Sequence, residues 1–282
     1  MHHQNKDLTN LLFKRKFFKL DLNEVDFNEK YIEKLLCIFI LAGCSAIDIN
    51  VQNQDIKFLK NSINLALNND KNLQEPLVWK PFIISSFYKQ YLESKNLDLK
   101  KVISQAIIEG TTIIEFHLSE FTTQEAIRVL SRIQDFPAEI ILSISISRKN
   151  HSNASIIEII KYAKNIVGKN LIIEVESFSS SIKNNQFNET LQTLSTVDII
   201  NKQLKNKEIK YSKLPIIVAG STNNQTSNLA YECGVKYNGI AFGKYAISVL
   251  SKSIFSNIQS RNDELLLEIN YIKNFIEKSF SI

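Results

Sequence analysis

Two segments in the last third of the chain place glycine and small polar residues directly after an apolar run. They are residues 215–223 (PIIVAGSTN) and residues 238–245 (NGIAFGKY). Glycine lets backbone N–H groups approach a ligand closely, and the N-terminus of a following helix adds partial positive charge. The pattern predicts a site for phosphate or another anion. The residues expected to bind it are Gly220, Ser221, Thr222, Asn223, Gly243 and Lys244.

A second interpretation of the same residues remains open. Ser221 and Thr222 are good helix N-caps, so their role could be to begin a helix. Capping and anion binding use the same backbone donors, and the sequence alone does not separate the two. The formal charge of Lys244 counts only if its side chain turns toward the ligand.

Three ionisable residues in other apolar runs are candidates for acid–base catalysis: Lys19, Asp48 and Glu115. A lysine and carboxylates beside a phosphate site suit proton transfer on a phosphorylated substrate. A buried ion pair of Lys19 with Asp48 or with Glu115 is the structural alternative. Nothing next to Lys19 in the sequence indicates activation for Schiff-base formation.

Two strand-like segments carry polar pairs at a spacing of two. Glu115 is followed by His117, and Glu174 is followed by Glu176. Side chains two residues apart in a strand point to the same face, so each pair is expected on one side of the sheet. A single histidine such as His117 is more often a hydrogen-bonded structural residue than a catalytic one.

Familiar catalytic and cofactor motifs are missing from the chain. It has no nucleophile elbow, no Walker loop and no strand-coupled GxGxxG. The three cysteines, Cys37, Cys44 and Cys233, lie in no CxxC or Cys/His ligand spacing. We therefore expect reduced thiols, no metal and no cofactor.

Strand-like and helix-like segments alternate along the whole chain. The expected strands are residues 16–20, 46–50, 81–86, 112–118, 139–147, 171–176, 214–219 and 237–242. Eight such alternations predict an α/β fold, a TIM-like (β/α)8 barrel forming a single domain over residues 1–282. Residues 256–282 are expected to form a C-terminal helical extension, which would either dock a partner or cover the barrel wall.

Glycine placement supports the same fold. Gly43, Gly110, Gly168 and Gly234 each follow a helical segment and precede a strand. A residue with positive φ is favoured there, and glycine adopts it without steric cost. Four glycines thus mark the end of the barrel opposite the predicted anion site.

Composition argues against nucleic acid and membrane as partners. The net charge of +5 is spread out, and basic runs at 14–16 and 205–210 have no interleaved aromatic residues. No apolar run is long enough to span a bilayer, and the N-terminus lacks the features of a signal or transit peptide. Abundant Lys, Asn and Ile, whose codons are A/T-rich, suit an organelle genome or an A/T-rich bacterium.

Several segments resemble the barrel of the cyanobacterial light-dependent period protein family, LdpA. Residues 214–226 and 239–250 are similar to its strand with a Gly-Gly-Thr-Asn-like turn and its Gly-Val-Ala-Phe-Gly-like strand. Residues 18–20, 41–49 and 114–117 look like its Val-Lys-Leu opening, its second strand and its Val-Glu-Ile-His strand. The resemblance implies a regulatory barrel, and with the codon bias it implies a plastid-encoded protein of the stroma.

The chain departs from that family at one place. LdpA-like proteins carry a cysteine-rich, ferredoxin-like insert with iron–sulfur clusters after the third strand. Here Ser85 and Ser86 end the predicted strand, and residues 87–96 contain no cysteine. Cluster-based redox sensing therefore does not transfer to this chain.

Two functions follow from these observations. The first is a non-catalytic regulatory barrel that binds a phosphorylated or otherwise anionic ligand, with or without a protein partner. The second is an enzyme acting on a small phosphorylated substrate through Lys19, Asp48 and Glu115. The enzyme requires these groups to converge near the Gly220–Gly243 site, and it fails if they are locked in mutual ion pairs.

Overall fold

The computed structural model describes most of the barrel. The described residues are 8, 12, 17–23, 29–51, 56–69, 80–94, 97–136, 140–176, 186–205, 214–219, 229–230, 232–243, 267, 269–274 and 276–277. Of the predicted anion site, only Gly243 falls within these ranges. No helix among the described residues is long and apolar enough to cross a membrane.

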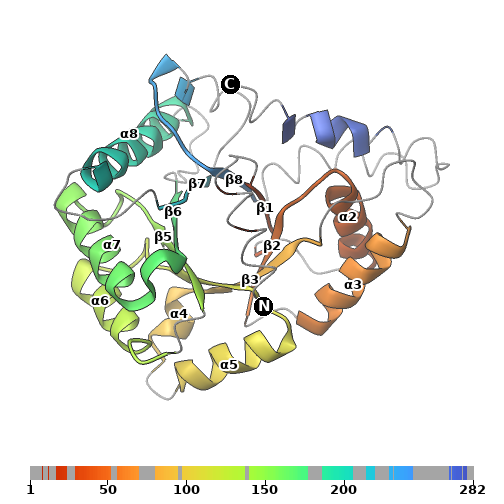
Figure 1. Ribbon diagram of the computed structural model, residues 1–282, viewed down its shortest axis with the longest axis horizontal. Coiled ribbons are helices and arrows are strands. Elements are labelled where there is room, and N and C mark those ends of the chain that lie inside the picture. The colour runs from red at the N-terminus through yellow and green to blue at the C-terminus, as the bar shows by residue number, and fades with distance from the viewer. Residues whose placement is uncertain are drawn as a thin grey trace.

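Eight parallel strands close into a barrel in the order β1 to β8, with β8 pairing back onto β1 (Figure 1). The TIM-like fold is therefore confirmed. The strands are β1 (Phe17–Asp21), β2 (Ala46–Asn50), β3 (Phe82–Phe87), β4 (Ile113–His117), β5 (Ile141–Ile146), β6 (Leu171–Glu176), β7 (Ile216–Ala219) and β8 (Gly239–Phe242). All eight match predicted strands to within a few residues.

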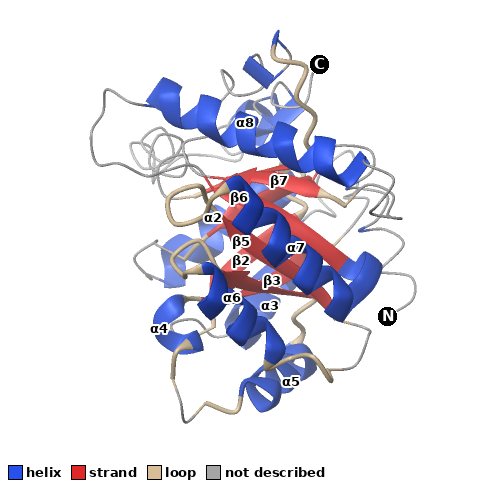
Figure 2. Cartoon of the chain, turned by 90° about the vertical axis from the view of Figure 1, so that its left-hand side faces the viewer, coloured by secondary structure: helices blue, strands red, loops and turns tan. Residues whose placement is uncertain are grey.

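Helices surround the barrel on its outside, as Figures 1 and 2 show. They are α2 (Glu29–Leu41), α3 (Ile56–Asn69), α4 (Lys89–Leu92), α5 (Leu99–Glu109), α6 (Thr123–Ser131), α7 (Asn153–Val167) and α8 (Gln186–Lys205), with a 3-10 turn, η2 (Gly168–Asn170). The sequence did not predict α4, which is a single turn. Described residues between 267 and 277 are also helical, and the role of the C-terminal extension stays a prediction.

Local sequence explains where the helices begin and end. Asp98 and Ser152 accept hydrogen bonds from the first turns of α5 and α7, and Thr122 forms a capping box with Glu125 at α6. At the other ends, the four glycines at 43, 110, 168 and 234 all have positive φ. The glycine prediction is thus confirmed.

Gly239 has a different reason to be glycine. An added Cβ there would lie 2.7 Å from the backbone oxygen of Phe17, its register partner on β1. Only a residue without Cβ lets β8 and β1 come this close and close the barrel at this point.

Alternating residues along each strand form two separate apolar clusters. One cluster lies between the strands and the helices, and it includes Phe18, Ile47 and Ile114. The other, which we call the apolar lumen cluster, consists of inward-facing apolar strand residues together with Leu8 and Leu12, which precede β1. Its members are Leu8, Leu12, Phe17, Ala46, Phe82, Ile84, Ile113, Ile141, Ile172, Ile217, Ala219 and Ala241.

The apolar lumen cluster occupies mainly the amino-terminal end of the barrel. Along β1, Phe17 belongs to it, whereas the next inward residues are Lys19 and Asp21. The same change occurs along β4, from Ile113 to Glu115 and His117. The inside of the barrel therefore passes from apolar to ionisable as the strands approach their carboxyl ends.

Candidate functional site

The ammonium group of Lys19 lies at the centre of a buried ionic network. Its Nζ is 2.8 Å from Asp48 Oδ2, 2.7 Å from Glu115 Oε1 and 2.8 Å from Glu174 Oε2. The Lys19, Asp48 and Glu115 side chains are completely shielded from solvent, and that of Glu174 is 2% exposed. We call these four residues, contributed by β1, β2, β4 and β6, the Lys19 network.

Neutral groups complete the coordination of Asp48. Ser86 on β3 donates a hydrogen bond to Asp48 Oδ1 at 2.5 Å, and the side-chain amide of Asn23 donates to Asp48 Oδ2 at 3.0 Å. Such donors offset part of the cost of removing a carboxylate from water. Asp48 is therefore held in place by groups from three different segments.

His117 lies one layer nearer the carboxyl end of the barrel. Its Nε2 is 3.1 Å from Glu115 Oε1 and its Nδ1 is 2.9 Å from Glu176 Oε1. Ser145 on β5 also donates a hydrogen bond to Glu176. The ring of Tyr88 stacks on the imidazole with centroids 4.0 Å apart and an interplanar angle of 11°.

The pKa values of the two cations are raised by their neighbours. Burial alone lowers the pKa of Lys19, but Asp48, Glu115 and Glu174 outweigh it and hold the pKa well above the usual value. Burial likewise lowers the pKa of His117, and contacts with Glu115 and Glu176 outweigh it. Both groups therefore carry their protons at neutral pH.

The carboxyl groups divide into two sets. Burial raises the pKa of Glu115 and of Glu176, but the nearby cations outweigh it, and both pKa values lie below the usual range. In Asp21, Asp48 and Glu174 burial prevails and the pKa is raised, to about 7 for Asp48. Glu115 stays ionised because it contacts both cations, whereas Glu174 contacts only Lys19.

These pKa shifts reflect a charge imbalance among the described residues of the upper lumen. Five carboxyl groups face two cations, namely Lys19 and His117. A low-dielectric interior disfavours uncompensated charge, so the surplus carboxyl groups retain protons. The interior is thus close to electrically neutral despite its many acids.

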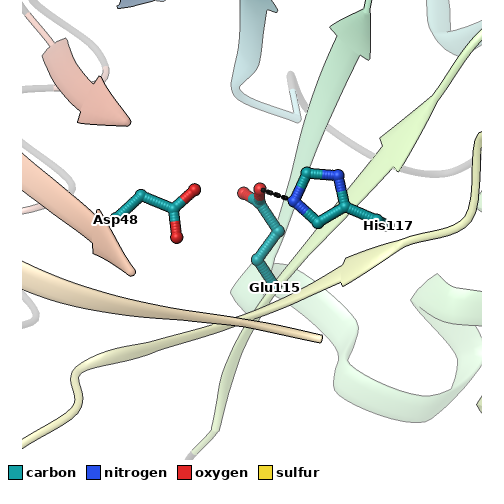
Figure 3. Close-up of side chains that lie close together, drawn as sticks. All are labelled: Asp48, Glu115 and His117. Carbon is teal, nitrogen blue, oxygen red and sulfur yellow. Dashed lines mark ion pairs between the residues drawn. The ribbon is translucent and has the colours of Figure 1, made fainter. Parts of the chain in front are cut away.

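Asp48, Glu115 and His117 are close enough together to offer ligand atoms to a metal ion (Figure 3). Two observations argue against a metal at this point. The ammonium of Lys19 contacts Asp48 and Glu115 directly, so a cation already lies between them. A histidine whose pKa is raised is also a poor ligand, since metals bind neutral imidazole.

The structure brings together the three catalytic candidates, Lys19, Asp48 and Glu115, but it does so as mutual ion pairs. Their catalytic role stays a prediction. Of the predicted anion site, Gly220, Ser221, Thr222, Asn223 and Lys244 lie outside the described residues. Gly243 follows β8, and a Cβ atom added to it would lie 3.8 Å from Asp21 Oδ2.

Sequence reasoning missed four residues that take part in the site: Asn23, Ser86, Tyr88 and Ser145. A signal was present for three of them. Ser86 near the end of β3 and Tyr88 directly after β3 are spaced by two, and Ser145 in β5 lies between Ser143 and Ser147, which directly follows β5. Small hydroxyl residues at alternate positions of a buried strand indicate an inward face that is polar.

Comparison with known proteins shows the fold. The tryptophan synthase alpha subunit from Legionella pneumophila str. Paris is 14% identical, with 99% of this chain and 98% of that chain covered and a TM-score of 0.58. The YdjI aldolase from Escherichia coli K12 is 12% identical, with 97% and 92% covered and a TM-score of 0.54.

A third solved structure is a truncated form of 3-deoxy-D-arabino-heptulosonate 7-phosphate synthase from Thermotoga maritima. It is 14% identical, with 93% of this chain and 84% of that chain covered and a TM-score of 0.53. No protein-family profile matches the chain, and no curated protein matches it. At these identities the likeness supports a TIM-barrel fold and leaves the function to the site itself.

Proposed function

We propose that the chain is a non-catalytic regulatory barrel that binds a phosphorylated or otherwise anionic small molecule at the carboxyl ends of β7 and β8. It is an LdpA-like protein that works without iron–sulfur clusters, in the stroma of a plastid. A protein partner would read the bound state, and neither nucleic acid nor membrane is involved. The segment resemblances to LdpA and the A/T-rich codon bias support this assignment.

The observation that carries the proposal is the mutual pairing of the ionisable groups. A lysine must lose its proton to act as a nucleophile, and Lys19 is held protonated by its contacts with three carboxyl groups. His117 is held protonated between Glu115 and Glu176, so it is a poor general base. Groups fixed in this way stabilise a binding site better than they move protons.

The inward residues nearest the carboxyl ends of β7 and β8 are small. They are Ala219 on β7, Ala241 on β8 and Gly243 directly after β8. The two lumen cations are already neutralised, so an anion would depend on backbone N–H groups and on Lys244. The predicted cup would supply such donors, because glycine permits close backbone approach.

Thermal unfolding of the purified protein against a panel of phosphorylated metabolites and nucleotides tests the proposal. A ligand at about one hundred times its Kd stabilises the folded state by roughly 2.7 kcal/mol, which raises Tm measurably. The Gly220→Asp and Gly243→Asp variants should lose the shift, because each places a negative charge at the predicted site.

Ile108→Asp is the matched control, since Ile108 is 76% exposed on α5 and remote from the lumen. It should keep the ligand-induced shift. Incubation of the protein with any stabilising compound, followed by mass spectrometry, then checks for turnover. Chemical change of the compound would contradict a non-catalytic barrel, and the absence of any specific shift would contradict the anion site.

One observation favours the alternative of an acid–base enzyme on a small phosphorylated substrate. Burial raises the pKa of Asp48 to about 7, a value suited to giving and taking protons at neutral pH. Its complete burial opposes that role. If turnover is found, Asp48→Asn should reduce kcat by about a hundredfold or more while leaving ligand binding intact.

A further inference from the structure

Leu8 and Leu12 close the lumen at the amino-terminal end of the barrel. They are the described residues that precede β1, each is 3% exposed, and both belong to the apolar lumen cluster. Both are helical, and side chains four positions apart lie on one face of a helix. The pair therefore covers apolar surface that would otherwise meet water. We call Leu8 and Leu12 the leucine plug.

The side chain of Asn238 anchors the leucine plug. Its Nδ2 donates a hydrogen bond to the backbone oxygen of Leu12 at 3.0 Å, and its Oδ1 accepts one from the backbone nitrogen of Ile216 at 2.9 Å. The backbone nitrogen of Asn238 also donates to the oxygen of Ile216 at 2.7 Å. One carboxamide thus joins the plug to the start of β7, a role that requires both a donor and an acceptor.

The residue after Asn238 makes this asparagine chemically vulnerable. Of the seven glycines in the chain, only Gly239 follows an asparagine. Asparagine is among the thermolabile residues, and a glycine after it has no Cβ to hinder attack of its nitrogen on the asparagine side chain. A bulkier residue does not fit at this position, because an added Cβ would lie 2.7 Å from the backbone oxygen of Phe17. The fold therefore requires both members of an Asn-Gly pair.

We propose that Asn238 is a modification site, whose deamidation follows local opening of the amino-terminal end of the barrel and then releases the leucine plug. The nitrogen of Gly239 bonds to Cγ of Asn238, and the bond from Cγ to Nδ2 breaks. The proton of the Gly239 nitrogen leaves with Nδ2 as ammonia, so that a succinimide ring remains. One water molecule then opens the ring to aspartate or isoaspartate. Asparagine and water thus become aspartate and ammonia, with no oxidant or reductant.

The folded state protects Asn238 from this reaction. Ring closure moves the carboxamide, so its bonds to Leu12 and Ile216 must break first. Gly239 is itself buried in β8, where it pairs with Phe17 of β1 and Ile217 of β7. When opening and closing are fast, the observed rate is the chemical rate multiplied by the fraction of molecules that are open. Deamidation therefore reports how often this end of the barrel opens.

The product holds the leucine plug less well than the original asparagine does. An ionised aspartate at position 238 only accepts hydrogen bonds, so the backbone oxygen of Leu12 loses its donor and faces a negative charge instead. The backbone nitrogen of Ile216 can still donate to the new carboxylate. The plug is thus released while β7 and β8 remain joined. Because the ammonia is lost to solvent, a molecule that has reacted stays altered.

Peptide mapping by mass spectrometry tests the protection. The full-length protein is incubated at neutral pH with and without concentrated urea, and the fraction of aspartate and isoaspartate at position 238 is followed over time. We expect deamidation to be at least about tenfold faster in the unfolded chain, since two hydrogen bonds and the burial of the plug oppose opening. Equal rates would show that the fold does not protect Asn238, and no reaction in urea would show that it is not a modification site.

Two leucine variants separate local opening from global unfolding. Leu12→Ala weakens the plug but keeps the backbone oxygen that Asn238 binds. Leu130→Ala makes the same change in α6, at a completely buried residue of the other apolar cluster. We expect Leu12→Ala to speed deamidation of Asn238 at least about tenfold, and Leu130→Ala to speed it far less for an equal loss of stability in urea. Equal acceleration by both variants would overturn local opening in favour of global unfolding.

A third comparison tests the release of the plug. Asn238→Asp reproduces the product, and hydrogen exchange measured by mass spectrometry should be faster in the peptide that contains Leu8 and Leu12. Asn165→Asp, at an exposed position of α7, is the matched control and should leave that exchange unchanged. Asn238→Ala also removes the donor, without adding charge, and it serves if the aspartate variant does not fold. Wild-type exchange in the Asn238 variant that folds would overturn the release.

Discussion

The lower and upper halves of the barrel lumen are built by the same eight strands yet are held together by different forces. In the lower half, Phe17, Ile113 and Ile172 bury apolar surface, which is favourable without any particular partner. In the upper half, Lys19, Glu115 and His117 depend on specific neighbours. The lower half therefore supplies stability, and the upper half supplies a fixed arrangement of charges that is costly to disturb.

Removal of the central cation of the upper half should cause the largest loss of stability. Lys19→Met would leave Asp48, Glu115 and Glu174 buried without their shared ammonium. We expect a loss of about 3–5 kcal/mol in the free energy of unfolding, measured by urea denaturation. Lys161→Met, on the exposed face of α7, should change it by less than about 0.5 kcal/mol. A Lys19 variant as stable as the wild type would show that the network is dispensable.

Truncation of a side chain in the lower half should cause a smaller loss of stability, and that loss should not depend on pH. Ile172→Ala removes a buried side chain from the apolar lumen cluster, and we expect a loss of about 2–4 kcal/mol. Because no charge is involved, the loss should be equal at pH 5 and pH 7.5 in chemical denaturation. Ile108→Ala, on an exposed helix face, is the control. A strongly pH-dependent loss would mean that the two halves are coupled.

The upper half should impose a pH dependence on stability. Burial raises the pKa of Asp48 to about 7, whereas an unfolded aspartate titrates near about 4. Between these values the folded protein holds a proton that the unfolded chain has released, so stability falls as pH rises through this window. Asp48→Asn should reduce that fall by on the order of 1 kcal/mol between pH 5 and pH 7.

Asp135→Asn provides the comparison for that measurement, since Asp135 is 88% exposed on its side chain. It should leave the slope of stability against pH unchanged. An Asp48→Asn variant with the full wild-type slope would show that the surplus proton resides on Glu174 or Asp21 instead.

The smallest effect is expected at the rim of the upper half. Tyr88→Leu removes the ring that stacks on His117, and we expect a loss of about 0.5–1.5 kcal/mol. The pKa of His117, followed by NMR of its ring protons, should remain above its usual value because Glu115 and Glu176 are retained. A His117 pKa that returned to the usual value would show that Tyr88, and not the carboxylates, sets its charge.

Sequence patterns were sufficient to predict the barrel and to predict which side of a strand several lumen residues share. Strand and helix periods do not depend on distant residues, so β2 and β6 matched their predicted ranges residue for residue. The pairs Glu115–His117 and Glu174–Glu176 were placed on common faces by the period of two, and the structure has both pairs facing inward. The anion site remains a sequence prediction, with Gly243 as its one described member.

The sequence could not predict which side chains pair with one another inside the lumen. Lys19 could have paired with Asp48 or with Glu115, and the structure has it contacting both and Glu174 as well. Those residues are 29, 96 and 155 positions away along the chain, so only the closure of the barrel brings them together. The role of Asn23 was missed for the same reason, since it depends on Asp48 of another strand.

By itself, the sequence determined the alternation of strands and helices, the helix ends at positive-φ glycines, and the sorting of polar residues toward the carboxyl ends of the strands. These follow from local backbone preferences and from the period of each element. Only the tertiary structure decided which carboxyl groups share the ammonium of Lys19 and which keep protons. Burial and distance set those charges, and both exist only once eight separate strands enclose the same dry interior.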